Sequence, residues 1–160
     1  MSPDQLQLER RPFIYQLRGE TQPEPIWQSE FVVNGRDLAT LLDFLEERPW
    51  FGQTCFEQNP AARETAVPAL RGLAPPHNQL GSGRFVLYGC HCGSDFCGVI
   101  SCAISRTDDE VVWSDIRFEE EPGGGEEIPY PARIPELRFA AAAYDADIAA
   151  YLQRLEQEGV

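Results

Sequence analysis

Residues 84–121 carry the strongest fold signal in the chain and read RFVLYGCHCGSDFCGVISCAISRTDDEVVWSDIRFEEE. Phe85–Tyr88 is an apolar run typical of a buried strand, and Gly98–Arg106 and Val111–Glu119 have the same β-type composition. The polar segment Thr107–Glu110 separates the last two runs and is typical of a turn. These three runs therefore predict an antiparallel β-meander.

Upstream of the meander, strands are predicted at Phe13–Arg18 and Trp27–Val33, and the Asn-Gly pair at 34–35 indicates a turn. A helix is expected next, because four leucines recur with the spacing of one helical face. These leucines are Leu38, Leu41, Leu42 and Leu45. Asp37 is placed to cap this helix and Pro49 to end it.

Residues 50–80 predict an irregular segment with one short helix near Ala61–Leu70. A mobile acidic loop is expected at about 119–129, where glutamates surround three glycines. A final helix should be capped by Asp145 and end at Gly159, with one buried face. That face holds Ile148, Tyr151, Leu152 and Leu155. The prediction is an α+β fold, with residues 1–160 as a single domain in which two main helices pack on one antiparallel sheet.

The charge of the chain excludes several functions. It has 160 residues, of which 26 are acidic and 13 basic, for a net charge of −13, and every basic residue is an arginine. Schiff-base chemistry on lysine and the phosphate-loop lysine are therefore excluded. The negative charge disfavours binding to nucleic acid and to anionic membranes, and it favours a basic protein partner.

No secretory signal and no membrane span is recognisable in the sequence, so the cytoplasm is the expected compartment. In that compartment the five cysteines are expected to be unpaired, metal-bound or redox-active rather than joined in disulfides.

The cysteine cluster Cys90-His91-Cys92-Gly93-Ser94-Asp95-Phe96-Cys97 carries the chemistry that the sequence offers. One interpretation is a zinc site, because Cys92 and Cys97 have a spacing close to that of zinc-binding pairs and Cys90 adds a third thiol. His91 is the first candidate for the fourth ligand, with His77 and Asp95 as alternatives. In an extended chain, however, Cys90 and Cys92 point to one face and His91 to the other.

Two other interpretations of the cluster stay open. The thiols could perform redox chemistry, although the sequence lacks a C-x-x-C pair and a helix after Cys97. Alternatively, Cys92 and Cys97 frame a hairpin loop whose glycines allow unusual backbone angles, and the sulfurs simply pack. Cys102 shares a strand face with Ile100 and Ile104 and is expected to be a small buried residue.

The segment Cys92-Gly93-Ser94-Asp95-Phe96-Cys97-Gly98, with Trp113 downstream and residues 33–38 upstream, resembles a group of small uncharacterised bacterial proteins with a CG-x-x-x-CG hairpin. The resemblance implies a bacterial, cytoplasmic, single-domain protein and assigns no activity.

The sequence favours a non-enzymatic module that binds a protein partner, with a regulatory or immunity-like role. This hypothesis rests on the net charge, on the glutamate-rich loop and on the scarcity of catalytic groups. The alternative is a zinc-binding or thiol-dependent enzyme that uses Cys90, Cys92 and Cys97. A homo-oligomer is a third possibility.

Overall fold

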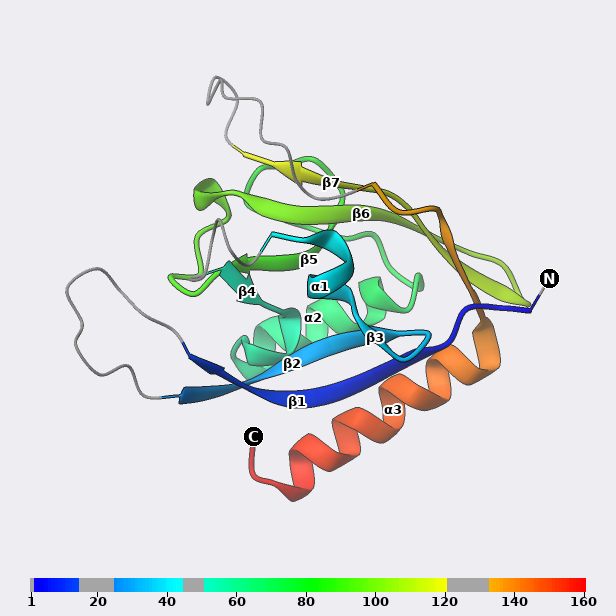
Figure 1. Cartoon of the computed structure of the whole chain (residues 1–160), viewed down its shortest axis with the longest axis horizontal. Coiled ribbons are helices and arrows are strands. Elements are labelled where there is room, and N and C mark those ends of the chain that lie inside the picture. Colours follow the sequence, from blue (N-terminus) through cyan, green and yellow to red (C-terminus); the bar gives the residue numbers. More distant parts are fainter. Residues whose placement is uncertain (1, 15–24, 45–50, 121–132) are drawn as a thin grey trace.

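Two antiparallel sheets enclose the core of the protein (Figure 1). The computed structural model describes residues 2–14, 25–44, 51–120 and 133–160. Its smaller sheet has the order β1-β2-β3, with strands Leu6–Ile14, Pro25–Val33 and Arg36–Asp37. The larger sheet has the order β4-β5-β6-β7-β8. Its strands are Phe51–Gln53, Phe85–Cys90, Val99–Arg106, Glu110–Glu119 and Leu137–Ala140.

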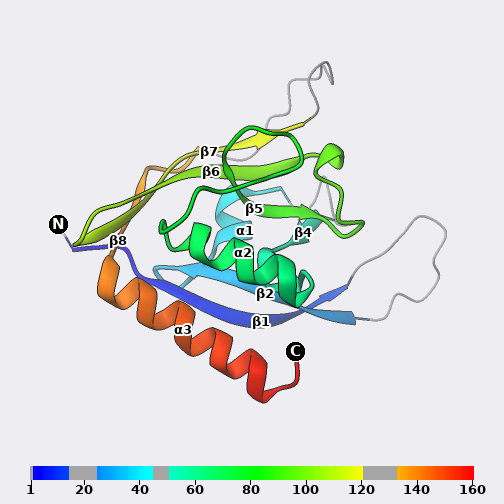
Figure 2. The same ribbon diagram turned by 180° about the vertical axis from the view of Figure 1, so that it is seen from behind.

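The helices cover the sheets from several sides. They are α1 (Leu38–Leu42), α2 (Pro60–Leu70) and α3 (Ala141–Gln157), and the 3₁₀ turns are η1 (Cys55–Glu57) and η2 (Asp95–Cys97). Helix α3 runs along β1, and α2 lies in front of the space between the sheets when the molecule is seen from behind (Figure 2). No helix in the described ranges is long and apolar enough to span a bilayer.

The α+β class and the meander β5-β6-β7 are confirmed. The strand 27–33, the turn at 34–35 and the helix near 61–70 are also confirmed. The prediction of a single sheet is wrong. A second sheet forms because β1 pairs with β2 along its whole length, and β1 begins at Leu6, before the predicted start at Phe13. Residues 15–18 of that predicted strand, and residues 45–49 at the predicted end of the first helix, lie outside the described residues.

Of the two aspartates predicted as helix caps, Asp37 occupies the N-cap position of α1 without a side-chain capping bond, and the prediction for Asp145 is wrong. Asp37 precedes α1 but makes no side-chain cap, because its carboxylate binds Arg11 at 3.0 Å. Helix α1 then ends at Leu42, since Asp43 adopts a left-handed backbone with φ 55°. Asp145 lies within α3, which follows β8 directly from Ala140. The described structure thus has α1 shorter and α3 longer than predicted.

Asp145 instead joins α3 to two other parts of the fold. Its carboxylate accepts hydrogen bonds from Arg106 at 2.6 and 2.9 Å and from Arg71 at 3.1 Å. These bonds, chiefly those from Arg106, lower the pKa of Asp145 to about 2. The carboxylate therefore ties α3 to the end of α2 and to β6.

Aromatic rings fill the space between the sheets. Phe31 of β2 contacts Trp113 of β7 and Tyr88 of β5 edge-on, with ring centroids 5.5 and 5.8 Å apart. The indole of Trp113 donates to the Tyr144 hydroxyl at 3.0 Å, and this hydroxyl donates to the carbonyl of Leu70 at 2.5 Å. One buried cluster therefore connects both sheets with α2 and α3.

Replacing Tyr144 by phenylalanine should destabilise the fold by about 2–4 kcal/mol, because the buried indole N–H and the buried carbonyl both lose their partner. Urea unfolding measures this loss. Tyr151→Phe is the matched control. Within the described residues, the Tyr151 hydroxyl has one hydrogen-bond partner, the Ser29 hydroxyl. Equal losses in the two variants would contradict the prediction.

Candidate metal centre

Three cysteine sulfurs converge where the chain turns from β5 into β6. The Sγ atoms of Cys90, Cys92 and Cys97 all lie within 4.8 Å of one another, and those of Cys92 and Cys97 are 3.4 Å apart. Thiolates around a tetrahedral zinc ion, with Zn–S bonds of about 2.3 Å, lie about 3.8 Å from one another. The observed separations are therefore close to those of a zinc–thiolate site.

Two glycines shape the turn that brings Cys97 back to the other thiols. The N–H of Gly93 donates to the carbonyl of Cys90 at 3.0 Å, and Gly93 has a left-handed φ of 80°. The Ser94 hydroxyl then caps η2, which ends at Cys97. Gly98 has a φ of 100°, which redirects the chain into β6. The predicted role of glycine in this loop is confirmed.

The three thiols differ in acidity because they share hydrogen bonds. The Ser94 N–H points at the Cys92 sulfur from 3.4 Å, and this bond, followed by one with Cys90, lowers the pKa of Cys92. Burial raises the pKa of Cys90, and the hydrogen bond with Cys92 raises that of Cys97 to about 12. Cys92 is thus the most acidic of the three thiols. Metal binding would release the protons that the ligating sulfurs still carry.

None of the predicted fourth ligands joins the three sulfurs in the described structure. His91 lines a separate cavity of about 260 Å³ together with Glu57 and Arg63. His77 is exposed and lines another cavity, as does Asp95, whose carboxylate accepts the N–H of Gln79 at 2.7 Å. Within the part of the chain that the structure describes, the site therefore consists of the three thiols.

Gln79 holds the turn in place from the preceding loop. Its backbone N–H donates to the Asp95 carboxylate. In addition, its side-chain oxygen accepts the N–H of Asp95 at 2.9 Å, and its side-chain nitrogen donates to the carbonyl of Gly93 at 3.1 Å. These contacts bind the residues between Cys92 and Cys97 to a loop about 15 positions earlier in the chain. The thiol cluster is consequently supported from outside its own hairpin.

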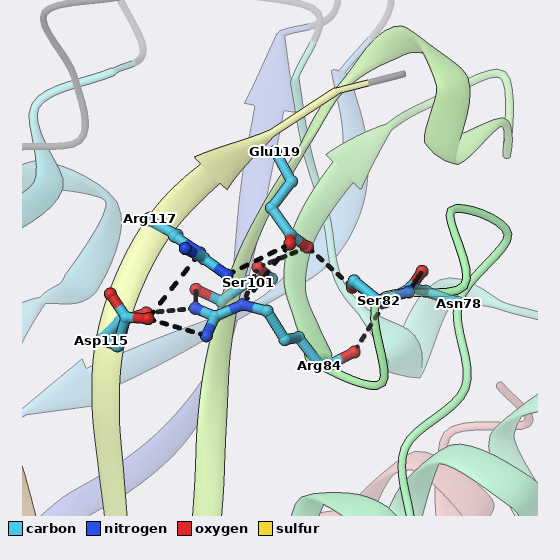
Figure 3. A network of polar contacts seen from close by, with 7 residues as sticks. All are labelled: Asn78, Ser82, Arg84, Ser101, Asp115, Arg117 and Glu119. Carbon is cyan, nitrogen blue, oxygen red and sulfur yellow. Dashed lines mark hydrogen bonds and ion pairs between the residues drawn. The ribbon is translucent and has the colours of Figure 1, made fainter. Parts of the chain in front are cut away.

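A buried arginine braces the adjoining end of the sheet (Figure 3). The Arg84 guanidinium donates to the Ser101 hydroxyl at 2.9 Å and to the Asp115 carboxylate at 3.0 Å, and it also binds the Asp115 carbonyl. Glu119 accepts from the hydroxyls of Ser101 at 2.8 Å and Ser82 at 3.0 Å. The network ties β6 and β7 to the loop before β5.

This network also revises the predicted mobile loop at 119–129. Glu119 is the last residue of β7, pairs with Val99 in the sheet and has a side chain that is only 13% exposed. The rest of the predicted loop beyond Glu120 lies outside the described residues.

The cysteines fall into a buried and an accessible group, and all five lie in the described residues. Cys55 and Cys102 are buried, as predicted for Cys102, whereas Cys92 and Cys97 are exposed and Cys90 is partly buried. The interpretation in which the sulfurs of Cys92 and Cys97 simply pack is therefore wrong. The short 3₁₀ turn leaves both thiols on the outside of the hairpin.

Sequence reasoning missed the residues that support the cluster. Gln79 and Arg84 lie in a segment without periodicity, and no local pattern indicates what they contact. Ser94 could have been found, because a serine just before a turn is a common cap.

Comparison with protein-family models, with curated proteins and with solved structures gives no match. The resemblance to proteins with a CG-x-x-x-CG hairpin therefore stays a prediction, and the functional argument rests on the geometry of the site.

Proposed function

We propose that this protein binds a zinc ion through the thiolates of Cys90, Cys92 and Cys97. The observation that carries the proposal is the convergence of the three Sγ atoms within 4.8 Å on a turn braced by Gln79. Thiolates are soft ligands that favour zinc over calcium or magnesium. The net charge of −13 adds a long-range attraction for a cation.

The proposed site is peripheral to the core. Neither Cys92 nor Cys97 belongs to the buried cluster that joins the sheets and helices. The core is large enough to hold the fold without metal, so zinc should contribute only its binding free energy to stability. Since the described residues supply three ligands, the fourth tetrahedral position is left for water or for a donor atom from outside this set. This arrangement suits exchange or presentation of zinc better than a purely structural role.

Cobalt(II) titration of the reduced, metal-free protein tests the proposal. Thiolate-to-cobalt charge-transfer absorption should grow to one ion per chain, and zinc should then displace the cobalt. Replacing Cys92 or Cys97 by serine should weaken zinc binding more than about 100-fold, because even residues that only support ligands contribute 10- to 100-fold.

His91→Ala and Cys102→Ala are the matched controls, and both should retain the affinity of the unmodified protein. His91 lies next to two of the sulfurs in sequence but lines another cavity, and Cys102 is buried in β6. Absence of charge-transfer absorption at stoichiometric cobalt would refute the proposal. A large loss of affinity in His91→Ala would refute the three-thiolate ligand set.

We also propose, as a second function, that the protein binds a basic protein partner. Two exposed aromatic side chains support it, Trp27 on β2 and Phe96 in the cysteine turn (residues 90–98), at 57% and 52% exposure. Aromatic residues on a protein of strongly negative net charge suit such an interface. A pull-down at low salt that recovers no protein would count against this function. The cytoplasmic location and a homo-oligomeric state stay predictions.

A further inference from the structure

Cys92 and Cys97 form the most accessible pair of thiols in the described structure. Both side chains are exposed, and their sulfurs are 3.4 Å apart. A disulfide bond is about 2.05 Å long, so the two sulfurs need to approach by only about 1.4 Å. Side-chain rotation provides part of such a shift. Gly93, which follows Cys92 in the turn, is uncrowded, since an added Cβ there would meet nothing within 4 Å.

From this pair we infer an oxidative modification site: Cys92 and Cys97 form a reversible intramolecular disulfide when the protein meets hydrogen peroxide. In the first step, one thiolate attacks the peroxide, the O–O bond breaks, and the sulfur becomes a sulfenic acid while hydroxide leaves. In the second step, the other thiol attacks this sulfur, the S–S bond forms, and water leaves. Two thiols lose two electrons and two protons, and one peroxide is reduced to two waters.

The structure makes this reaction selective among the five cysteines. Cys55 and Cys102 are buried within the core, so peroxide has little access to them. Cys90 is partly buried and packs against the core from the end of β5. The oxidised form should therefore contain the Cys92–Cys97 bond, with Cys90 remaining a thiol.

The disulfide would also control metal binding, and this consequence rests on the proposed zinc site. A disulfide sulfur no longer has the negative charge that makes a thiolate a metal ligand. Oxidation would remove two of the three thiolates and leave Cys90 alone, so the zinc ion should be released. Reduction by a dithiol should restore the site.

The test treats the full-length, metal-free protein with one equivalent of hydrogen peroxide and then blocks the remaining thiols. Intact mass should show the loss of two hydrogen atoms. Cleavage after arginine and before aspartate separates residues 85–94, which hold Cys90 and Cys92, from residues 95–106, which hold Cys97 and Cys102. The two peptides should be joined until a reductant is added.

Single substitutions identify the bond. Cys92→Ser and Cys97→Ser should abolish the linkage between the two peptides, whereas Cys90→Ser and Cys102→Ala should retain it. A disulfide within peptide 85–94, a dimer joined through disulfides, or sulfinic acid without any disulfide would overturn the inference.

A parallel experiment on zinc-loaded protein separates this inference from the proposed function. Peroxide should release one zinc ion per chain in step with disulfide formation, as measured with a chromogenic chelator. Zinc binding without formation of the disulfide would overturn the inference and leave the zinc site standing. A disulfide in a protein that binds no zinc would refute the zinc site and support the modification site.

Discussion

Replacing Gly98 by alanine is expected to destabilise the protein by about 2–5 kcal/mol, the sum of backbone strain and overpacking. Gly98 has a φ of 100°, a conformation that residues with a side chain rarely adopt. A Cβ at this position would also lie 2.7 Å from Cε2 of Phe118 and closer still to Cζ. Both the backbone and the Phe118 ring would have to shift. The neighbouring residue in the chain is Cys97, one of the three clustered cysteines.

Gly93→Ala is the matched control in the same turn. Gly93 also has a positive φ, of 80°, but an added Cβ would meet nothing within 4 Å. This variant should lose only about 1–2 kcal/mol, the strain of a left-handed residue. Chemical unfolding of the two metal-free variants separates the effect of the clash from that of the backbone.

A double substitution tests the mechanism. Phe118→Leu makes room beside Gly98, so Gly98→Ala should cost less in that background than in the original protein. Strictly additive losses, or equal losses in Gly93→Ala and Gly98→Ala, would contradict the clash with Phe118.

The second large effect concerns pH: the protein should lose stability between about pH 4.5 and pH 7. Glu30 is buried, and its carboxylate binds the Tyr88 hydroxyl and the N–H of Phe31 at 2.8 Å. Burial raises the pKa of Glu30 from 4.5 to about 7, and burial does the same for Glu57. Folding therefore favours the protonated form of both carboxyl groups.

The sign follows from the two pKa values of each group. Below about pH 4.5, Glu30 is protonated in the folded and unfolded states, and its contribution is fully present. As the pH rises to about 7, the unfolded chain loses the proton first, and the contribution is lost. The change for Glu30 is up to about 3 kcal/mol, since one pKa unit corresponds to about 1.4 kcal/mol. Asp145, with a pKa lowered to about 2, acts oppositely, and its contribution is lost below about pH 3.8.

Unfolding free energies measured at pH 5 and at pH 8 test this prediction. Glu30→Gln stays neutral at both values and still offers an oxygen to Tyr88. It should therefore be more stable than the original protein at pH 8 and show a smaller pH dependence. Glu64→Gln, which removes an exposed carboxylate, controls for the change in net charge. A rise in stability between pH 5 and pH 8, or an unchanged slope in Glu30→Gln, would contradict the prediction.

Residue patterns over short distances were sufficient for most of the individual elements. An apolar run predicts β5, β-type composition predicts β6 and β7, and the Asn-Gly pair predicts the turn after β2. The predicted strand begins too late, because the charged residues 9–11 in the middle of β1 separate its apolar start at Leu6 and Leu8 from its apolar end at Phe13 and Ile14. Asp145 resembles a helix cap in sequence, but its two arginine partners come from distant parts of the chain.

The candidate metal site also has some features that the sequence predicts and others that depend on the fold. The amino-acid sequence alone places three thiols and two glycines on one turn between two strands, because spacing and strand geometry are local properties. The folded arrangement is needed to show that the sulfurs of Cys92 and Cys97 are exposed and in contact, that His91 lines another cavity, and that Gln79 supports the turn. These features depend on side-chain directions and on contacts between segments far apart in the chain, which no local pattern encodes.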